Sequence, residues 1–364
     1  MAAGAGLAGC GLLAGDEEAP PPPPNPATRP VDPAIDGDVV LANWSQYLAP
    51  ELVSGFESEF GVSVVESHFE SMVDLLGRLR AGNKYDVVFA TAQVADQLRR
   101  SGRLHVIDPA RLGNVGNVIG AFPYFAAAWY DPGFTYVLPY TVRKTGLVWR
   151  KDQLGDTLPG SWADLWDARA RGRTYLLGHQ DETLGMAALR LGYDINTAEP
   201  AELTAIVDLL RELVPLLARN GFADDGLARL LDGTAWLHQT WSSDMARVLR
   251  NPPLGAEFGF ETPAEGVPIG LDTMAVPANA AHPGSALVFL DYLLRPENAG
   301  RNIEYLGNQM PVGGTEETYA EMIAAAPGAV VTATEIASGP YFRPGDDAAT
   351  QRRTDAFAQV RSGA

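Results

Sequence analysis

The fold of this chain is decided by the stretch Tyr85-Asp86-Val87-Val88-Phe89-Ala90. Its apolar residues form a continuous run instead of alternating with polar ones, which is typical of a strand buried on both faces in a parallel sheet. Residues 71–81 before it and residues 93–101 after it have the pattern of helices, and Gly82 ends the first of them. The stretch is therefore a strand between two helices.

Two more strands are predicted upstream, at Val39-Val40-Leu41-Ala42 and at Val62-Ser63-Val64-Val65. Between them, residues 50–60 form a helix whose Leu52, Phe56 and Phe60 share one face at a spacing of four. The order strand, helix, strand, helix, strand predicts a doubly wound α/β sheet with helices on both faces.

The rest of the chain is expected to leave this unit and return to it. Residues 136–140 and 145–150 are apolar strands, and residues 140–145 between them are taken as the first crossing. Helices are predicted at residues 183–191, 200–220 and 242–249, and a strand at 272–277 returns to the first unit. We therefore expect two lobes around one cleft, lobe 1 from residues 37–140 plus 270–308 and lobe 2 from residues 141–269 plus 309–364.

The N-terminal residues are interpreted as a lipoprotein signal followed by a tether. Residues 1–15 are small and apolar, and Leu7-Ala8-Gly9-Cys10 resembles a bacterial lipobox, in which the cysteine is lipidated. Residues 16–36 are polar and rich in proline, which favours an extended, semi-rigid stalk. A secretory signal starts with basic residues, and none is present, so we expect the true start to lie upstream.

Composition narrows the class of protein. The 364 residues carry a formal net charge of −18, which disfavours binding to nucleic acid and only weakly favours a cationic ligand. The single cysteine excludes a disulfide within the chain, the five histidines are scattered, and no apolar run approaches the ~20 residues of a membrane span. Motifs of hydrolases, P-loop proteins and dinucleotide-binding enzymes are absent from the sequence, so we expect neither an enzyme nor a cofactor.

The folded part resembles bacterial extracellular solute-binding proteins of the spermidine/putrescine type, from about Val39 to the C-terminus. The landmarks are Asn43-Trp44-Ser45-Gln46-Tyr47, Tyr85-Asp86-Val87-Val88, Pro139-Tyr140, Ser161-Trp162-Ala163-Asp164-Leu165-Trp166, Leu191-Gly192-Tyr193, the run from Leu271 to Ala280, and Leu293-Leu294-Arg295-Pro296. The resemblance implies a type II periplasmic-binding-protein fold with a multi-strand hinge. It also implies a monomeric extracytoplasmic receptor that closes on a polyamine and delivers it to an ABC permease.

The resemblance also implies a set of ligand contacts. Polyamine capture needs carboxylates for the ammonium groups and aromatic faces for the methylenes. The residues that match the family's contacts are Trp44, Gln46, Tyr47, Thr91, Gln93, Glu182, Trp241 and Asp272, with Asp181, His179, Asn308 and Arg343 as weaker matches. For Trp44 the alternative is a core position, and for Asp181 and Glu182 it is a helix cap or first-turn charge.

Several positions depart from the family pattern. Gln46 stands where a glutamate is common, Gln93 replaces an aromatic, and Gly270 replaces the aromatic two residues before Asp272. Arg143 and Lys144 follow the first crossing, where the family has neutral residues. These basic side chains either face outward, pair with the acidic residues of the site, or indicate an anionic or zwitterionic ligand. A different ligand class, such as a thiamine-like compound or a sugar, therefore remains open.

Overall fold

The computed structural model describes residues 29–121, 124–125, 128–223, 226–249, 252–315, 317–318, 321 and 327–363. The lipobox cysteine, Cys10, and most of the proposed tether lie outside these residues. The end of the proposed tether, from residue 29 to residue 36, is described. The Asp36 carboxylate accepts hydrogen bonds from the backbone N–H groups of Gly284 and Ser285, at 3.1 and 2.9 Å, so the chain is already fixed to the fold before residue 37.

The first half of the molecule has the predicted alternation of strands and helices. Strand β1 lies between β2 and β3 and pairs with both in parallel. The elements are β1 (Val39–Asn43), α1 (Pro50–Phe60), β2 (Val64–His68), α2 (Met72–Arg80), β3 (Val87–Thr91), α3 (Ala92–Arg100), a 3-10 turn (Pro109–Arg111) and α4 (Val115–Ala121).

Asp86, immediately before β3, places a carboxylate in apolar surroundings. The side chain is buried, and its two oxygens accept hydrogen bonds from the backbone N–H groups of Val40 and His282, at 2.9 and 2.7 Å. It therefore joins β1 to the start of α11 (Pro283–Leu293), an element that is remote in sequence. A buried carboxylate is tolerated here because backbone donors replace its water.

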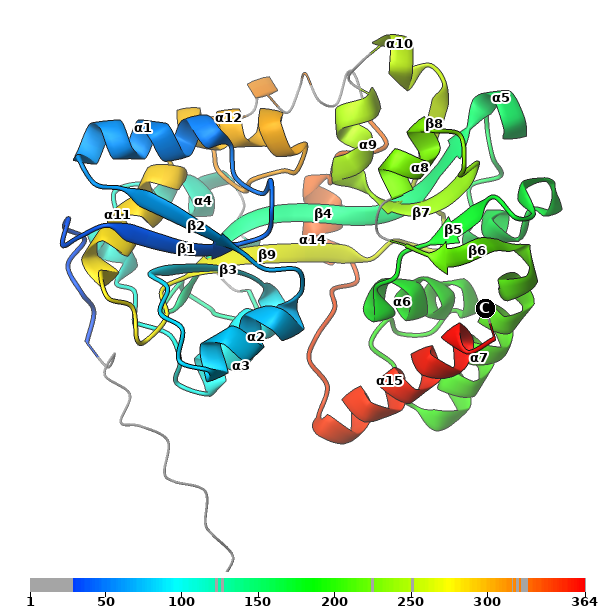
Figure 1. The fold of residues 1–364 in the computed structure, drawn as a ribbon, viewed down its shortest axis with the longest axis horizontal. Helices are drawn as coiled ribbons and strands as arrows, with labels where there is room; N and C mark the ends of the chain where they lie inside the picture. Colours follow the sequence, from blue (N-terminus) through cyan, green and yellow to red (C-terminus); the bar gives the residue numbers. More distant parts are fainter. Residues whose placement is uncertain are drawn as a thin grey trace, which may run out of the picture.

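Two long strands connect the halves (Figure 1). Strand β4 (Val137–Arg150) is continuous, whereas two strands separated by a crossing were predicted. From Val137 to Lys144 it pairs with β9 (Ile269–Ala275), and from Thr145 to Trp149 it pairs with β7 (Leu237–Trp241), both antiparallel. The sheet order is β2-β1-β3-β9-β4-β7-β5-β6, with β8 (Phe258–Glu261) paired to β4.

The second half repeats the α/β pattern. Its remaining strands and helices are α5 (Lys151–Leu154), 3-10 turns at Trp162–Trp166 and Ala168–Ala170, β5 (Thr174–Leu176), α6 (Gln180–Leu191), α7 (Pro200–Leu213), β6 (Leu217–Phe222), α8 (Gly226–Leu231), α9 (Ser242–Leu249), α10 (Pro252–Gly255), α14 (Ala333–Ser338) and α15 (Asp347–Arg361). The helix predicted to continue to residue 220 was too long. Pro215 lies in a 3-10 turn after α7 and cannot donate a helical hydrogen bond, so the chain turns there into β6.

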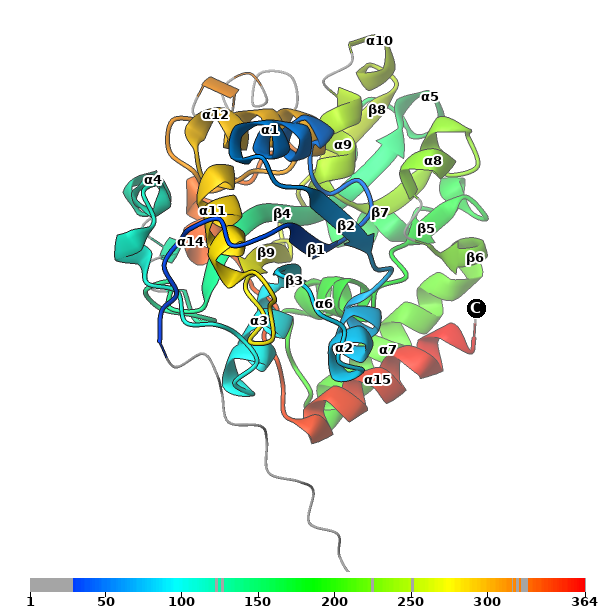
Figure 2. The ribbon, with the colours of Figure 1, turned by 60° about the vertical axis from the view of Figure 1, so that its left-hand side comes forward.

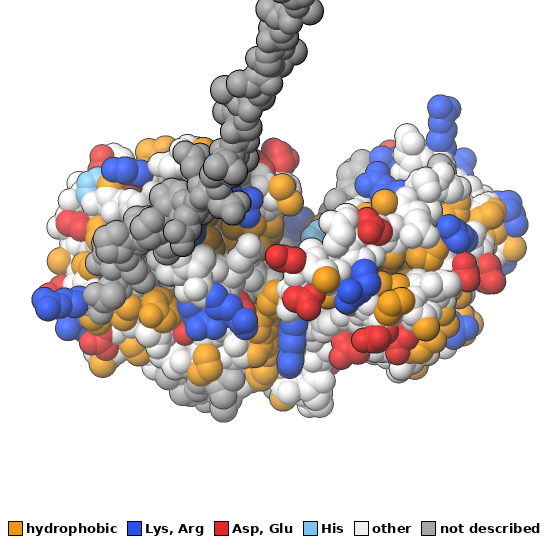
Figure 3. Space-filling view, turned by 90° about the horizontal axis from the view of Figure 1, so that it is seen from below, with side chains coloured by type: hydrophobic (Ala, Val, Ile, Leu, Met, Phe, Trp, Pro, Cys, Tyr) orange, Lys and Arg blue, Asp and Glu red, His pale blue; other side chains and the backbone are white. Residues whose placement is uncertain are grey.

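Helices cover both faces of each half (Figures 1 and 2). In the first half α1 and α12 (Pro296–Leu306) lie on one side of the sheet, and α2 and α3 lie on the other. In the second half α8 and α9 lie opposite α6, α7 and α15. The surface is hollowed between the two halves (Figure 3). The predicted two-lobe α/β architecture is thus confirmed, while the residue numbers given for the lobe boundaries stay a prediction.

One ion pair between a buried lysine and a half-buried glutamate fixes the connecting strand to α14. Lys144 is 3% exposed, and its ammonium lies 2.8 Å from the Glu335 carboxylate. Burial alone would raise the pKa of Glu335, but hydrogen bonds from Lys144 and from the Thr332 N–H and hydroxyl outweigh it, and the pKa falls below its ordinary 4.5. The pair therefore stabilises the fold above pH 4.5, and this stabilisation is lost as the pH falls through the lowered pKa.

We predict that Glu335→Gln lowers the free energy of unfolding by about 2 kcal/mol at neutral pH, between the values typical of exposed and buried ion pairs. Glutamine preserves the capping of α14, so the change isolates the charge. Urea denaturation at pH 7 and pH 3 should show the difference from wild type shrinking in acid. The control is Glu297→Gln, an exposed first-turn glutamate of α12. An equal loss at both pH values would contradict the assignment.

Candidate functional site

The site is centred on Asp272, in the middle of strand β9. Its side chain is 2% exposed, and its Oδ2 accepts hydrogen bonds from the Tyr47 hydroxyl at 2.5 Å and the Thr141 hydroxyl at 3.4 Å. The same oxygen forms an ion pair with the Arg143 guanidinium. The other oxygen, Oδ1, is buried and has no hydrogen-bond partner among the described residues. One oxygen of this carboxylate is therefore fully hydrogen-bonded, whereas the other can still accept a hydrogen bond.

Strand register explains how these groups meet. Asp272 pairs with Thr141, and Gly270 pairs with Arg143. Cross-strand partners point to the same face, and alternate residues of one strand do so too. Thr141, Arg143 and Thr145 therefore share the face of Asp272, whereas Lys144 points to the opposite face.

Gly270 makes the room that Arg143 needs. A Cβ atom at position 270 would lie 2.9 Å from the Arg143 Cζ and 3.1 Å from its Nε, inside contact distance. Because residue 270 is a glycine, the Arg143 guanidinium can lie over its Cα atom, and the Arg143 Cζ is 5.9 Å from the centroid of the Trp241 ring. Burial alone would lower the pKa of Arg143, but the Asp272 charge, with smaller electrostatic contributions from Tyr47 and Glu182, outweighs it and raises the pKa. Arg143 is therefore a permanently charged residue of the site.

Glu182 comes from the second half, in the first turn of α6. Its carboxylate is buried and accepts hydrogen bonds from the Thr145 hydroxyl at 2.6 Å and the Trp241 indole N–H at 3.0 Å. Gln239 donates to its backbone carbonyl at 2.9 Å. Thr145 and Trp241 are cross-strand partners, so Glu182 is held against the same sheet face as Asp272.

Aromatic side chains of the first half complete the site. The rings of Trp44 and Tyr47 meet edge to face with centroids 5.0 Å apart. Burial and the neighbouring Asp272 raise the pKa of Tyr47 well above its ordinary value, so its hydroxyl remains a donor at neutral pH. Asn308 donates to this hydroxyl at 3.2 Å, and the Asn308 Oδ1 is buried without a partner among the described residues.

Fewer contacts connect the other three proposed residues, Thr91, Gln93 and Gln46, to the site. Thr91 is the register partner of Asp272 on β3, and Gln93 follows in the first turn of α3, both half-buried. Gln46 is exposed in the turn after β1, with a φ of 56°. No contact of Gln46 or Gln93 with the site is given by the structure.

Three weaker candidates, described next, either form contacts outside the site or are exposed to solvent. Asp181 lies next to Glu182 in sequence but forms an ion pair with Arg353 of α15, at 3.1 Å. His179 is exposed at the cap position of α6 without a side-chain capping bond. Arg343 is exposed, and its backbone N–H donates to Asn196 at 2.8 Å. The sequence prediction missed Thr141 and Thr145, which the alternation along a continuous β4 would have revealed.

The charges of the site nearly balance. Asp272 and Glu182 are negative and Arg143 is positive, while the neighbouring Asp244 is paired with Arg247 at 3.1 Å. Within the part of the chain that the structure describes, no three His, Cys, Asp or Glu side chains gather in a way that could hold a metal ion. Acidic and aromatic groups arranged in this way can hold a cationic organic molecule by charge-assisted hydrogen bonds and cation–π contact.

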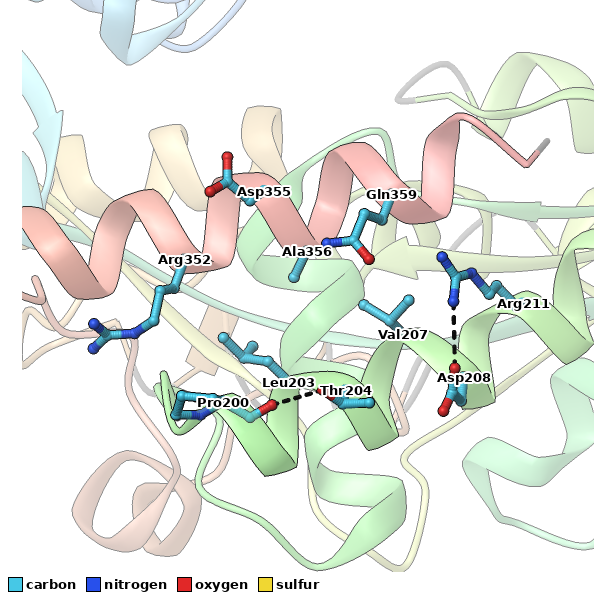
Figure 4. Close-up of a pocket in the computed structure, with 10 residues that line it drawn as sticks. All are labelled: Pro200, Leu203, Thr204, Val207, Asp208, Arg211, Arg352, Asp355, Ala356 and Gln359. Atoms are coloured by element: carbon cyan, nitrogen blue, oxygen red, sulfur yellow. Dashed lines mark hydrogen bonds and ion pairs between the residues drawn. The ribbon is translucent and has the colours of Figure 1, made fainter.

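A second depression, between α7 and α15, does not belong to this site (Figure 4). Leu203, Val207 and Ala356 form its apolar part, and Asp208 is paired with Arg211 at its edge. None of the candidate contact residues lines it.

We predict that Asp272→Asn lowers the free energy of unfolding by about 3 kcal/mol, because it leaves the largely buried Arg143 charge without its partner. Asparagine keeps an oxygen for the Tyr47 and Thr141 hydroxyls. Urea denaturation measures the loss, with the exposed Asp156→Asn as the control that should change stability little. A stability equal to wild type would show that Asp272 and Arg143 are not coupled.

Residues 51–327 match the family model described as bacterial extracellular solute-binding protein. The spermidine/putrescine-binding periplasmic protein of Escherichia coli (strain K12) is 31% identical over 272 residues, which cover 74% of this chain and 76% of that protein. The putrescine/cadaverine-binding protein of Pseudomonas aeruginosa is 26% identical over 284 residues, covering 75% and 78%.

Solved structures show the same fold at lower identity. A putative spermidine/putrescine ABC transporter protein from Listeria monocytogenes superposes with a TM-score of 0.79 at 22% identity, covering 89% of this chain and 99% of that one. A lipoprotein of Treponema pallidum gives a TM-score of 0.77 at 21% identity, covering 88% and 98%. Among the described residues, no helix has the length and apolar character required to cross a membrane.

Proposed function

The chain belongs to the family of bacterial extracellular solute-binding proteins, and from this premise we propose that it captures a polyamine or a related cationic amine for an ABC importer. The two halves close on the ligand, and the closed protein delivers it to the transmembrane permease. The protein acts outside the cytoplasm as a monomer and carries out no chemical conversion. Lipidation at Cys10 holds it on the membrane.

One observation carries this proposal: buried carboxylates from both halves lie on one face of the connecting strands. Asp272 belongs to the first half and Glu182 to the second, and Trp241 donates its indole N–H to Glu182. A ligand bound between them contacts both halves at once, so binding favours the closed form. Exclusion of water on closure strengthens each ionic contact.

The names of the relatives support the ligand class. The Escherichia coli protein is described as spermidine/putrescine-binding, and the Pseudomonas aeruginosa protein as putrescine/cadaverine-binding. Polyamines carry ammonium groups joined by methylenes. Carboxylates bind the ammonium groups, and the faces of Trp44, Tyr47 and Trp241 are suited to the methylenes.

A second candidate keeps the receptor and changes the ligand to an anionic or zwitterionic metabolite, a thiamine-like compound or a sugar. The observation in its favour is the Arg143 guanidinium, a cation within the site. A thermal-shift screen over ligand pools separates the classes, because a ligand that binds only the folded state raises the melting temperature.

We predict that Glu182→Gln and Asp272→Asn each weaken amine binding about tenfold to a hundredfold, the range for losing a hydrogen bond to a charged group. Isothermal titration with spermidine, spermine and putrescine measures this at 25 °C, after circular dichroism has shown that each variant is folded. Asp208→Asn, on the exposed face of α7, is the control and should bind like wild type. Absence of heat at millimolar concentration with all three amines and also with N-acetylputrescine would refute amine capture.

A further inference from the structure

We propose that the ligand carries one ammonium group at one end and a neutral amide at the other, as in a mono-acylated diamine, because Arg143 already supplies the second positive charge of the site. The inference rests on the proposed function and narrows its ligand class. It makes Arg143 the residue that determines specificity between singly and doubly charged amines.

The count of charges is the first argument. Asp272 is neutralised by Arg143 through a direct ion pair. The neighbouring Asp244 is neutralised by Arg247, and Lys144 with its partner Glu335 lies on the opposite face of β4. Among the described residues of the site, Glu182 is the carboxylate that forms no ion pair with a cation. One ammonium group therefore balances the site, whereas a diamine would leave an excess positive charge in a dry environment.

Arg143 is built into the site. Its side chain lies in space that exists only because residue 270 has no Cβ atom. The side chain is 18% exposed, and its Cζ lies 5.9 Å from the Trp241 ring centroid. One of its terminal nitrogens, Nη1, bonds Asp272. The guanidinium has further N–H groups that a ligand carbonyl can accept from.

The unpaired acceptors are the second argument. Asp272 Oδ1 and Asn308 Oδ1 are buried without a partner among the described residues, and both side chains are hydrogen-bonded to the Tyr47 hydroxyl. A buried acceptor left unpaired is unfavourable, so a ligand that donates a hydrogen bond to one of them gains affinity. A secondary amide supplies a carbonyl for Arg143 and one N–H, which Asp272 Oδ1 accepts. A carboxylate supplies no donor and adds a negative charge close to Glu182.

The test uses three ligands that are each built on a four-carbon chain: putrescine with two ammonium groups, N-acetylputrescine with one ammonium and one amide, and 4-aminobutyrate with one ammonium and a carboxylate. Isothermal titration of the full chain should show N-acetylputrescine binding about tenfold or more tightly than either of the others. In Arg143→Gln, putrescine should gain at least about tenfold in affinity relative to N-acetylputrescine.

Gly270→Ala is a second variant that leaves Arg143 present but forces it off its position, and it should shift the ranking in the same direction. If putrescine or 4-aminobutyrate binds wild type as tightly as N-acetylputrescine, the inference is overturned, whether or not the variants fold. If wild type binds one of these amines and the ranking is unchanged in a folded Arg143→Gln, it is also overturned. If no amine binds at all, the proposed function itself fails, and that result is distinct from the other two.

Discussion

The ion pair between Arg143 and Asp272 is the contact on which the rest of the site depends. It joins two antiparallel strands, β4 and β9, at the place where both pass from one half of the molecule to the other. Because the strands are paired in register, every second residue along them faces the site. The pair therefore sets the charge of the site and the position of the hydroxyl groups around it, from Tyr47 and Thr141.

A continuous β4 has a mechanical consequence as well. Its first part pairs with β9 and its second part with β7, so the two halves are connected by hydrogen-bonded strands. Contacts from both halves reach one sheet face: Tyr47 and Asp272 from the first, Glu182 and Trp241 from the second. In the proposed function, a ligand on this face contacts groups from both halves at once, so its binding energy favours closure.

The sequence predicted the architecture because local patterns and parallel-strand order are strong signals, as the first five elements from Val39 to Ala90 illustrate. It predicted Asp272, Glu182, Tyr47 and Trp241 through family resemblance, and the structure brings these four together. Two features were beyond sequence patterns. The ion pair of Asp181 with Arg353 depends on where a helix about 170 residues further on packs, and the role of Gly270 is visible only from the distance to Arg143.

The most direct test of the account is a crystal structure of the protein with its tightest-binding amine. The account predicts the ammonium nitrogen within hydrogen-bonding distance of the Glu182 carboxylate, the ligand chain against Trp241, and Arg143 still paired with Asp272. A ligand bound away from both carboxylates, or one whose cationic group has displaced Arg143 from Asp272, would contradict it.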